Sequence, residues 1–199
     1  MQNKLISLVT RSANQSKNQV FSAIQPARYL NDLNKQQAGQ DKTVLITGAS
    51  SGLGEGMARL FAKLGYNLAI CARRTDRLES LKSDLMATYP NIRVEYRALD
   101  VSDYEAIFTV FDAFAEDFGG IDRVVVNAGI GDSRRIGKGH FETNRRTADI
   151  NFISALAQCE AAMNIFRAQN SGHLVVISSM SAMRGLPKHL TAYGASKAG

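Results

Sequence analysis

The stretch TVLITGASSGLG at residues 43–54 decides the fold. Its first five residues, Thr43 to Thr47, are apolar and rich in β-branched side chains, which is typical of a buried strand. A glycine-rich turn follows at once, and the next residues repeat apolar side chains at helical spacing. A strand, a glycine-rich turn and a helix in this order predict the first unit of a domain that binds a phosphate-containing ligand.

The helix predicted after this turn covers Leu53 to Leu64. Its apolar residues recur three and four positions apart, so they share one face, which we expect to pack on the sheet. The residues of this face are Met57, Leu60, Phe61 and Leu64. Gly65 follows directly and is expected to close the helix as a C-cap glycine.

Segments of the same two kinds alternate through the rest of the chain. Strands are predicted at residues 67–72, 92–99, 121–126 and 172–178, and helices at residues 77–89, 103–118 and about 143–169. This alternation implies βαβ units and a parallel sheet covered by helices on both faces, hence an α/β fold. The last two strands are almost continuously apolar and are expected to be buried on both sides.

Composition supports one domain over residues 42–199. The chain of 199 residues is 45% hydrophobic and 21% charged, which is an ordinary globular composition. The formal net charge is +6, but residues 1–42 hold six basic and two acidic residues and so account for +4 of it. Because no basic stripe with interleaved aromatic residues remains, nucleic-acid binding is disfavoured. No apolar run approaches the roughly 20 residues of a membrane span.

Residues 1–41 are rich in Asn, Gln and Ser, and their first acidic residue is Asp32. We expect a polar, poorly ordered N-terminal extension; the alternative is an organellar transit peptide, because such peptides are Ser-rich and poor in acidic residues. Cys71 and Cys159 lack the spacing of metal ligands or of a disulfide framework and are expected to be two buried, reduced thiols. The expected location is therefore cytoplasmic, with an organelle as the alternative.

The glycine-rich turn has the spacing G-x-x-x-G-x-G, formed by Gly48, Gly52 and Gly54. Glycine is needed where a backbone approaches a phosphate or adopts a positive φ. The helix that begins here offers free N–H groups and its positive dipole end to a pyrophosphate, so a dinucleotide is the expected ligand. No Gly-Lys-Ser/Thr ends the turn, and kinase-like or NTPase chemistry is therefore disfavoured.

The end of the second predicted strand bears on the choice between NAD and NADP. An NAD site has an acidic residue there for the ribose hydroxyls, whereas NADP needs space and a cation for its 2′-phosphate. This strand ends in Cys71-Ala72-Arg73-Arg74, without a carboxylate, and Arg73 can present a planar fork to a phosphate. NADP is therefore expected ahead of NAD; the alternative is that Arg73 and Arg74 only solvate the next helix.

Tyr193 and Lys197 lie four residues apart, hence on one face of a helix. A tyrosine is a weak acid at neutral pH, and a neighbouring cation lowers its pKa. Ser178 and Ser179 end the fifth predicted strand, at the edge where open α/β sheets bind ligands. A hydroxyl there could bind a substrate carbonyl as negative charge develops on its oxygen.

With these motifs the sequence resembles the short-chain dehydrogenase/reductase family over residues 42–199. The matches occur in the family's order. They are Thr47–Gly54 for the TGxxxGxG turn, Asp100-Val101 for the adenine contact, Asn127-Ala128-Gly129 for the NAG motif, Asn151 for a helix asparagine, Ser179 for the serine, and Tyr193 with Lys197 for YxxxK. The resemblance implies a Rossmann-like, doubly wound parallel sheet with strand order 3-2-1-4-5.

The resemblance also implies a catalytic mechanism. In the reduction direction NADPH would deliver a hydride to a carbonyl carbon while Tyr193 protonates the oxygen. Lys197 would lower the pKa of Tyr193 and hold the nicotinamide ribose, Ser179 would polarise the carbonyl, and Asn151 would position a water beside Lys197. The implied cofactor-binding residues are Gly48, Ser50, Ser51, Gly52, Leu53, Gly54, Arg73, Arg74, Asp100, Val101, Asn127, Ala128, Gly129, Tyr193 and Lys197.

The sequence departs from the family's pattern in two respects. Ser179 and Tyr193 are 14 residues apart, one more than usual, with the extra residue near Pro187-Lys188-His189, so Ser181 is a rival for the role of the serine. The family chain also continues beyond the tyrosine motif, whereas this one ends two residues after Lys197. We therefore expect a fragment that lacks the C-terminal strands, leaves the fifth strand as an uncovered edge and is inactive alone.

Two functions remain open: an NADP(H)-dependent oxidoreductase of a small carbonyl or alcohol, and a non-catalytic NADP-binding regulator on the same fold. The basic residues between Gly129 and Asn151 could face an acidic substrate such as an acyl thioester carrier; the alternative is a solvated basic face. His140 has no neighbours with ligand spacing, so no metal site is expected. The resemblance implies a homo-oligomer for the full-length protein, and no membrane partner is expected.

Overall fold

The computed structural model of the chain describes residues 39–184 and 189–199, which lie in one compact unit. Two sequence predictions fall outside these described residues. One is the N-terminal extension of residues 1–41, of which 1–38 are not described, and the other is the extra residue expected near Pro187-Lys188-His189, of which only His189 is described.

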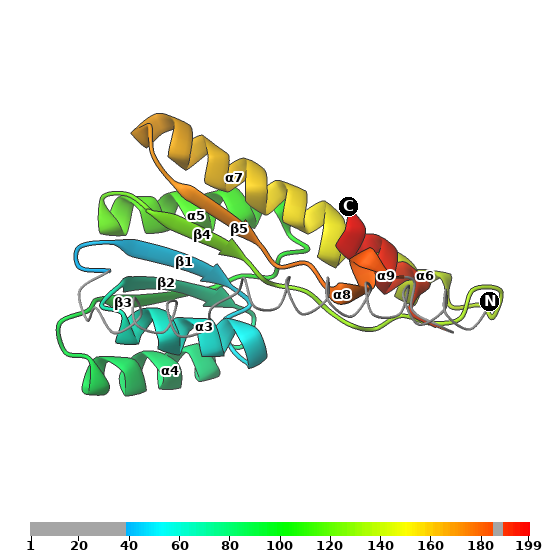
Figure 1. Cartoon of the computed structure of the whole chain (residues 1–199), viewed down its shortest axis with the longest axis horizontal. Helices are drawn as coiled ribbons and strands as arrows, with labels where there is room; N and C mark the ends of the chain where they lie inside the picture. The colour runs from blue at the N-terminus through cyan, green and yellow to red at the C-terminus, as the bar shows by residue number, and fades with distance from the viewer. Residues whose placement is uncertain (1–38, 185–188) are drawn as a thin grey trace, which may run out of the picture. The chain divides into compact units, whose positions relative to one another are not determined.

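Five parallel strands form one sheet in the predicted order β3-β2-β1-β4-β5 (Figure 1). The strands are β1 (Thr43–Thr47), β2 (Asn67–Ala72), β3 (Val94–Ala98), β4 (Arg123–Val126) and β5 (His173–Val176). The chain moves outward from β1 in one direction to β3, and then returns to the other side of β1 with β4. The turns after β1 and β4 therefore diverge, and this switch point is where open α/β sheets bind their ligands.

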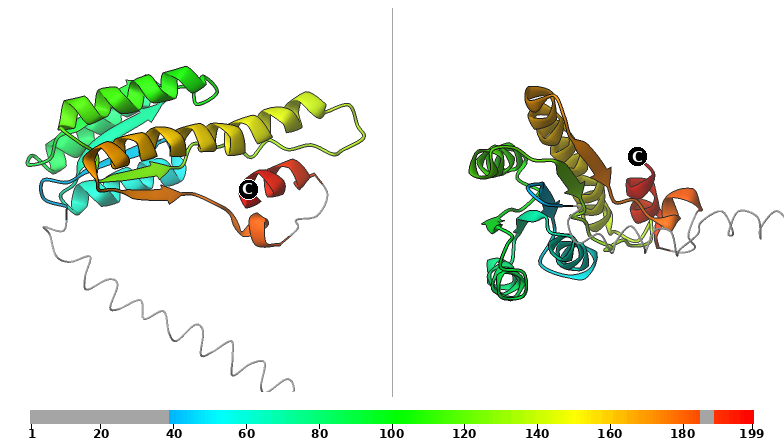
Figure 2. Two further views of the ribbon diagram at one scale, coloured as in Figure 1. Left: turned by 90° about the horizontal axis from the view of Figure 1, so that it is seen from above. Right: turned by 60° about the vertical axis from the view of Figure 1, so that its left-hand side comes forward.

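Helices cover both faces of the sheet, as expected for a doubly wound fold (Figures 1 and 2). On one face lie α3 (Gly52–Lys63) and α4 (Thr75–Thr88), and on the other lie α5 (Tyr104–Phe118) and α7 (Ser154–Gln169). Three further helices, α6 (Phe141–Ala148), α8 (Met180–Met183) and α9 (Thr191–Ala198), lie together beyond the carboxyl ends of the strands.

The core explains why the central strands read as apolar runs. All five residues of β1 are buried, and so are Val124–Val126 of β4. Phe111 and Phe114 of α5 are fully buried in a cluster that also contains Ile165 of α7. Each large side chain buried in this way contributes about 1.5–3 kcal/mol relative to exposure.

The buried face of α3 differs from the predicted one. Of the four residues of the predicted face only Leu64, which follows the last helical residue, is buried, and Leu60 is 45% exposed. The buried residues are Gly54, Ala58 and Ala62. Small side chains let α3 approach the sheet closely, because a Cβ at Gly54 would lie 2.3 Å from the carbonyl oxygen of Gly48.

The end of α3 agrees with the prediction for Gly65. This glycine has a φ of +83°, which favours glycine. The N–H of Gly65 donates to the carbonyl of Ala62 at 3.0 Å, and that of Tyr66 donates to Phe61 at 3.0 Å. These two bonds form a Schellman motif, which satisfies carbonyls left open at the helix end.

The helix predicted over residues 143–169 is longer and is not regular. It begins at α6, passes through a π-helical turn, η1 (Asp149–Ile153), and continues as α7. Hydropathy did not reveal the turn, because a π-helical turn inserts one residue without interrupting the run of helix-forming residues.

The prediction that β5 is buried on both sides is wrong, whereas the prediction of an uncovered edge agrees with the described residues. Val176 is 50% exposed, and β5 ends there, two residues before the predicted end at Ser178. Within the described residues β5 pairs with β4 alone. The apolar residues of β5 are therefore less completely covered than those of β4.

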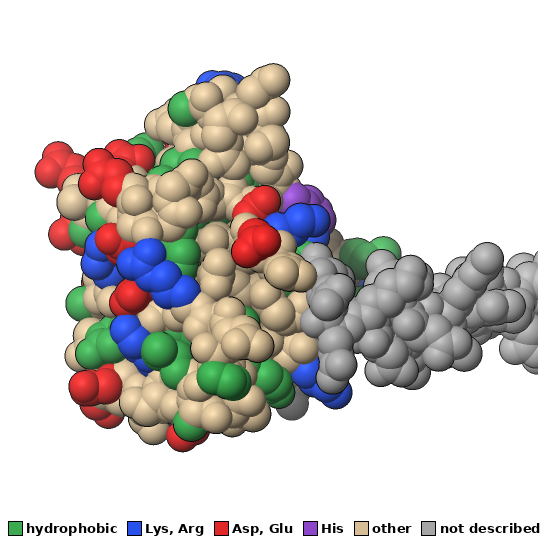
Figure 3. Space-filling view, turned by 90° about the vertical axis from the view of Figure 1, so that its left-hand side faces the viewer, with side chains coloured by type: hydrophobic (Ala, Val, Ile, Leu, Met, Phe, Trp, Pro, Cys, Tyr) green, Lys and Arg blue, Asp and Glu red, His purple; other side chains and the backbone are tan. Residues whose placement is uncertain are grey.

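Acidic and basic side chains are interspersed on the face at the amino ends of the strands (Figure 3). Arg97 forms an ion pair with Asp117 at 2.6 Å, and its guanidinium lies 5.0 Å from the ring centroid of Phe114. Arg93 adds an ion pair with Glu95 at 3.2 Å. Such charged pairs at the β3 edge of the sheet oppose its pairing with another strand.

Two glycines of α3 provide a matched test of its close approach to the sheet. Gly54→Ala is expected to lower the free energy of unfolding by about 1–3 kcal/mol, because the new methyl group meets the Gly48 carbonyl. Gly56→Ala has open space around its Cβ and is expected to raise it by up to about 1 kcal/mol through helix propensity. Urea denaturation of both variants checks this, and equal effects would contradict the packing described.

Candidate active site

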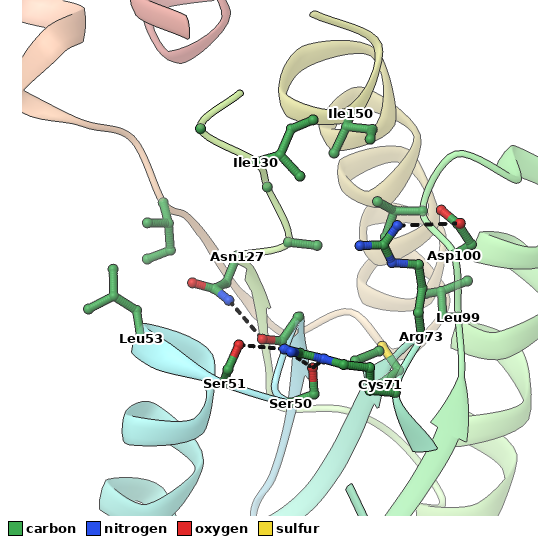
Figure 4. A pocket seen from close by; sticks show the side chains of 18 of the residues that line it. Ser50, Ser51, Leu53, Cys71, Arg73, Leu99, Asp100, Asn127, Ile130 and Ile150 are labelled. Atoms are coloured by element: carbon green, nitrogen blue, oxygen red, sulfur yellow. Dashed lines mark hydrogen bonds and ion pairs between the residues drawn. The ribbon is translucent and has the colours of Figure 1, made fainter. Parts of the chain in front are cut away.

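A cleft of about 370 Å³ lies at the carboxyl ends of the strands, at the switch point between β1 and β4 (Figure 4). Thirteen of the predicted site residues line it: Gly48, Ser50, Ser51, Leu53, Arg73, Arg74, Asp100, Val101, Asn127, Ala128, Gly129, Tyr193 and Lys197. Gly52, Gly54, Asn151 and Ser179 are not among its lining residues. The glycine-rich turn at residues 47–54, the candidate phosphate-binding turn, and the tyrosine motif therefore face one cavity, although more than 130 residues separate them in the sequence.

The sequence did not single out several apolar residues that line the same cleft. Ile130 follows the NAG motif, Ile150 precedes Asn151, and Leu99 precedes Asp100. Each is an immediate neighbour of a predicted residue, so adjacency to a motif was the available signal.

The turn after β1 is fastened to the end of β4 through Thr47. Its buried hydroxyl accepts hydrogen bonds from the N–H groups of Asn127 at 3.0 Å and Ala128 at 3.1 Å. The Asn127 side chain in turn donates to the Thr47 carbonyl at 2.9 Å. Gly48 sits against this junction, because a Cβ there would lie 2.9 Å from the Cα of Ala128. The NAG motif thus holds the glycine-rich turn in shape.

The amino end of α3 faces the cleft without a side-chain cap. Ser51 is the N-cap residue, but its side chain makes no capping hydrogen bond. The backbone N–H groups of the first turn are therefore available to an anion, with the positive end of the helix dipole behind them.

Arg74, rather than Arg73, contacts the phosphate-binding turn. Its Nη2 donates to Ser50 Oγ at 2.9 Å and to Ser51 Oγ at 2.6 Å, and its Nε donates to Ser50 Oγ at 3.2 Å. Arg73 instead lies 4.0 Å from Asp100 (Figure 4). Two guanidinium groups therefore border the cleft beside the end of β2, and both residues belong to the predicted cofactor-binding set.

Asp100 is held in its charged form. Burial alone would raise its pKa, but hydrogen bonds from the backbone and side chain of Ser102 and the charges of Arg73 and Arg146 together hold the pKa of Asp100 below its ordinary value. The Asp100 carboxylate accepts from Ser102 N at 3.0 Å and from Ser102 Oγ at 2.8 Å. The carboxylate is thus fixed at the wall of the cleft.

Tyr193 and Lys197 both lie on α9, one turn apart. Lys197 Nζ donates to the carbonyl of Ile177 at 3.0 Å, and burial lowers the pKa of Lys197. Ser178 Oγ donates to the carbonyl of Lys197 at 2.7 Å. Within the described residues no hydrogen bond joins the Tyr193 hydroxyl to Lys197 or Ser179. Ile177 and Ser178, which directly follow β5, therefore both bind Lys197 of α9.

Ser179 and Ser181, the two candidates for the role of the serine, are hydrogen-bonded to each other. Ser179 is the N-cap of α8, and its Oγ accepts from the N–H of Ser181 at 3.2 Å. The hydroxyl of Ser181, which is buried, donates to Ser179 Oγ at 2.9 Å. Ser181 therefore orients the hydroxyl of Ser179.

Asn151 is buried, and its carboxamide is bonded to protein groups on both sides. Its Oδ1 accepts from the N–H of Ile130 at 2.8 Å, and its Nδ2 donates to the Ile130 carbonyl at 2.8 Å and to Ser196 Oγ at 3.1 Å. Ser196 Oγ donates to the carbonyl of Tyr193 at 2.9 Å. Asn151 thus connects the loop after β4, through Ser196, to the backbone of Tyr193.

Ser133, which the sequence analysis did not identify, binds the other side of the Tyr193 backbone. It is buried in the loop after β4, and its Oγ accepts from the N–H of Tyr193 at 3.4 Å. Leu190, the residue at the N-cap of α9, has no side-chain acceptor for this group. Ser133 therefore supplies in trans the acceptor that an N-cap side chain gives to its own helix.

Among residues 39–184 and 189–199 no three His, Cys, Asp or Glu side chains could hold one metal ion. No helix in the same part of the chain is both long and apolar enough to cross a membrane. Burial raises the pKa of Cys71 to about 12. Both cysteines are free, although Cys159, expected to be buried, is only half-buried.

A family model described as short chain dehydrogenase matches residues 42–199. An uncharacterized oxidoreductase of Mycobacterium tuberculosis is 52% identical over 156 residues, which cover 78% of this chain and 62% of that protein. The chain therefore spans less than two thirds of the length of this curated relative.

Two solved structures show the same fold with different cofactors. An alcohol dehydrogenase from the archaeon Thermococcus sibiricus, complexed with 5-hydroxy-NADP, is 33% identical with a TM-score of 0.71, covering 78% of this chain and 65% of that one. An NAD+-bound xylitol dehydrogenase is 27% identical with a TM-score of 0.75, covering 81% and 62%.

Gly129→Ala is expected to disturb the contact region of Asn151 and Lys197. The added Cβ would lie 3.0 Å from Asn151 Oδ1 and 3.3 Å from Lys197 Nζ, so these atoms must move. Losing the bond from Ile130 N–H to Asn151, worth about 1 kcal/mol, should speed exchange of that amide roughly fivefold. Gly131→Ala, with nothing near its Cβ, is the control, and equal Ile130 protection in both variants would refute the contact.

Proposed function

Because the chain belongs to the short-chain dehydrogenase family, we propose that the whole protein is an oxidoreductase that interconverts a small carbonyl compound and its alcohol, with NADP(H) as cofactor and Tyr193 as the general acid or base. The observation that supports this most is the shared cleft. Tyr193 and Lys197 line the same cavity as the phosphate-binding turn. A cofactor held by that turn and a substrate beside the tyrosine would therefore meet in one space.

The residues around the cleft fit a dinucleotide. The glycines of the turn leave no side chain over its backbone, and the amino end of α3 offers N–H groups to a pyrophosphate. We assign Asp100 and Val101 to the adenine end and Lys197 to the nicotinamide ribose. When bound, NADP(H) donates or accepts the hydride.

The preference for NADP rests on charge at the end of β2. No carboxylate follows β2 to bind ribose hydroxyls, whereas Arg73 and Arg74 both border the cleft there. Ser50 and Ser51 hold the Arg74 guanidinium toward the turn, and a 2′-phosphate would receive hydrogen bonds from the same groups. Related structures contain either cofactor, so the family alone does not decide between NADP and NAD.

Each catalytic residue has a distinct proposed role. The Tyr193 hydroxyl gives a proton to the substrate oxygen during reduction and removes it during oxidation. Lys197 favours the phenolate by its positive charge. Ser179, oriented by Ser181, donates a hydrogen bond to the substrate oxygen as charge develops there. Asn151 supports the site through its hydrogen bonds to Ile130 and Ser196. A water bound beside Lys197 would lie near the Asn151 carboxamide.

A second candidate is a regulator that binds NADP without turnover. Such a protein would need the turn and the two arginines but not Tyr193 and Lys197 in the same cleft, and the presence of both residues there favours the enzyme. For the whole protein we further propose a cytoplasmic location, with an organelle as the alternative, and association of copies through the helices around Asn151. Neither nucleic acid nor a membrane surface is a proposed partner.

Tyr193→Phe is expected to lower kcat by about 100-fold or more, because the phenyl ring cannot transfer a proton. NADPH oxidation by the whole protein over a panel of ketones and aldehydes measures this. Tyr104→Phe, at the exposed start of α5, is the control and should retain activity. Turnover that survives the loss of the Tyr193 hydroxyl would overturn the mechanism, whereas NADPH binding without any turnover would favour the regulator.

Arg73→Ala and Arg74→Ala are each expected to raise the KM for NADPH about tenfold or more while changing that for NADH little. The reason is the loss of a charge-assisted hydrogen bond, worth about 1.5–3 kcal/mol, to the 2′-phosphate. Arg77→Ala, an exposed change in the first turn of α4, serves as the matched control. Equal effects on both cofactors would remove the mutated arginine from the phosphate site.

A further inference from the structure

The π-helical turn η1 lies beside the candidate site, because it contains Asn151 and Ile150, and Ile150 lines the cleft. In an α-helix the N–H of Ser154 would donate to the carbonyl four residues before it, that of Ile150. Here it donates to the carbonyl of Asp149, five residues before it. The turn is therefore one residue wider than its neighbours, and such turns are frequent at functional sites.

The side chain of Ser154 donates to the carbonyl that its backbone N–H would bind in a regular α-helix. Its hydroxyl donates to the carbonyl of Ile150 at 2.5 Å. Ser154 is fully buried, so no water competes for this carbonyl at the hydroxyl's position. One residue thus supplies a donor to two consecutive carbonyls, through its N–H to Asp149 and through its hydroxyl to Ile150.

Gln158 holds the Ser154 hydroxyl from the next turn of α7. Its Nε2 donates to Ser154 Oγ at 3.2 Å and to the Ser154 carbonyl at 3.1 Å. Gln158 is fully buried, and its Oε1 has no hydrogen-bond partner within the described residues. A buried acceptor without a partner is destabilising, and an apolar side chain of similar size would avoid this cost. The amide donors are therefore what distinguishes glutamine from leucine at this position.

The turn determines where Asn151 points. The extra residue rotates the helix between α6 and α7, so that Asn151 reaches Ile130 and Ser196 while Ile150 lines the cleft. Ser196 continues this connection to the carbonyl of Tyr193. Any relaxation of η1 to regular helix would turn Asn151 away from these partners by about the 100° that separates successive helix residues.

We propose that Ser154 and Gln158 are positioning residues that hold η1 in its π-helical form and thereby align Asn151 and the backbone of Tyr193. The catalytic part of this proposal rests on the function proposed above. The structural part concerns only the hydrogen bond between Ile130 and Asn151. The two readouts, turnover and exchange of the Ile130 amide, are therefore separable.

The test compares Ser154→Ala and Gln158→Leu with a control on the same helix, Ile165→Val. Both test variants are expected to lower kcat of the whole protein about tenfold, to change the KM for NADPH less than twofold, and to speed exchange of the Ile130 amide. Gln158→Leu is expected to melt at or above the wild-type Tm, because it removes the unpartnered acceptor. Ile165→Val should lower Tm by forming a cavity and leave kcat unchanged.

Wild-type kcat in both test variants would overturn the catalytic role, and wild-type exchange at Ile130 would overturn the structural one. A loss of kcat that merely follows Tm, as shown by an equal loss in Ile165→Val, would also overturn the positioning role. If the wild-type protein turns over no substrate, the proposed function fails, and exchange at Ile130 still decides whether the two residues hold the turn.

Discussion

The rest of the site depends on the hydroxyl of Thr47, which accepts from two successive N–H groups at the end of β4. A parallel sheet delivers its loops to one edge but does not by itself fix them relative to one another. This oxygen joins the phosphate-binding turn to the segment that continues into Gly129 and Ile130. From Ile130, Asn151 and then Ser196 extend the same hydrogen-bonded framework to Tyr193. The glycine-rich turn and the tyrosine motif are thus linked by one set of hydrogen bonds, of which the bond from Asn151 to Ser196 is fully buried and the others are partly buried.

Much of the fold could be predicted from the sequence, because the signals were local. The bounds of β1 and β2 matched the structure, since a β-branched run ended by a glycine turn or by charged residues leaves little choice of boundary. The buried face of α3 could not be predicted in the same way. Its contact with the sheet uses Gly54, Ala58 and Ala62, and hydropathy gives such small residues little weight beside Leu60. The close distance between α3 and the sheet, rather than the hydrophobicity of the side chains, decides which face of α3 is buried.

The candidate site was predictable as a set of motifs and not as a network. Tyr193, Lys197 and the glycine turn followed from spacing and chemistry, yet their roles stay proposals. Sequence could not show that Arg74 rather than Arg73 reaches Ser50 and Ser51, since the two differ only in the direction in which the chain leaves β2. Nor could it show Ser133 beneath Tyr193, or the wider turn at Asn151, because both depend on contacts between segments that no local pattern records.

The burial of Cys71 beneath the cleft has a practical use. Cys71 lines the cleft from β2, yet its side chain has no exposed surface, and burial holds its pKa at about 12. A thiolate is the species that alkylating reagents attack, so this sulfur reacts only when β2 opens. Its labelling rate therefore reports how often β2 opens beneath the cleft, and this can be measured without knowing the substrate. A dinucleotide bound in the cleft would lower the labelling rate of Cys71 in proportion to the fraction of molecules that hold it.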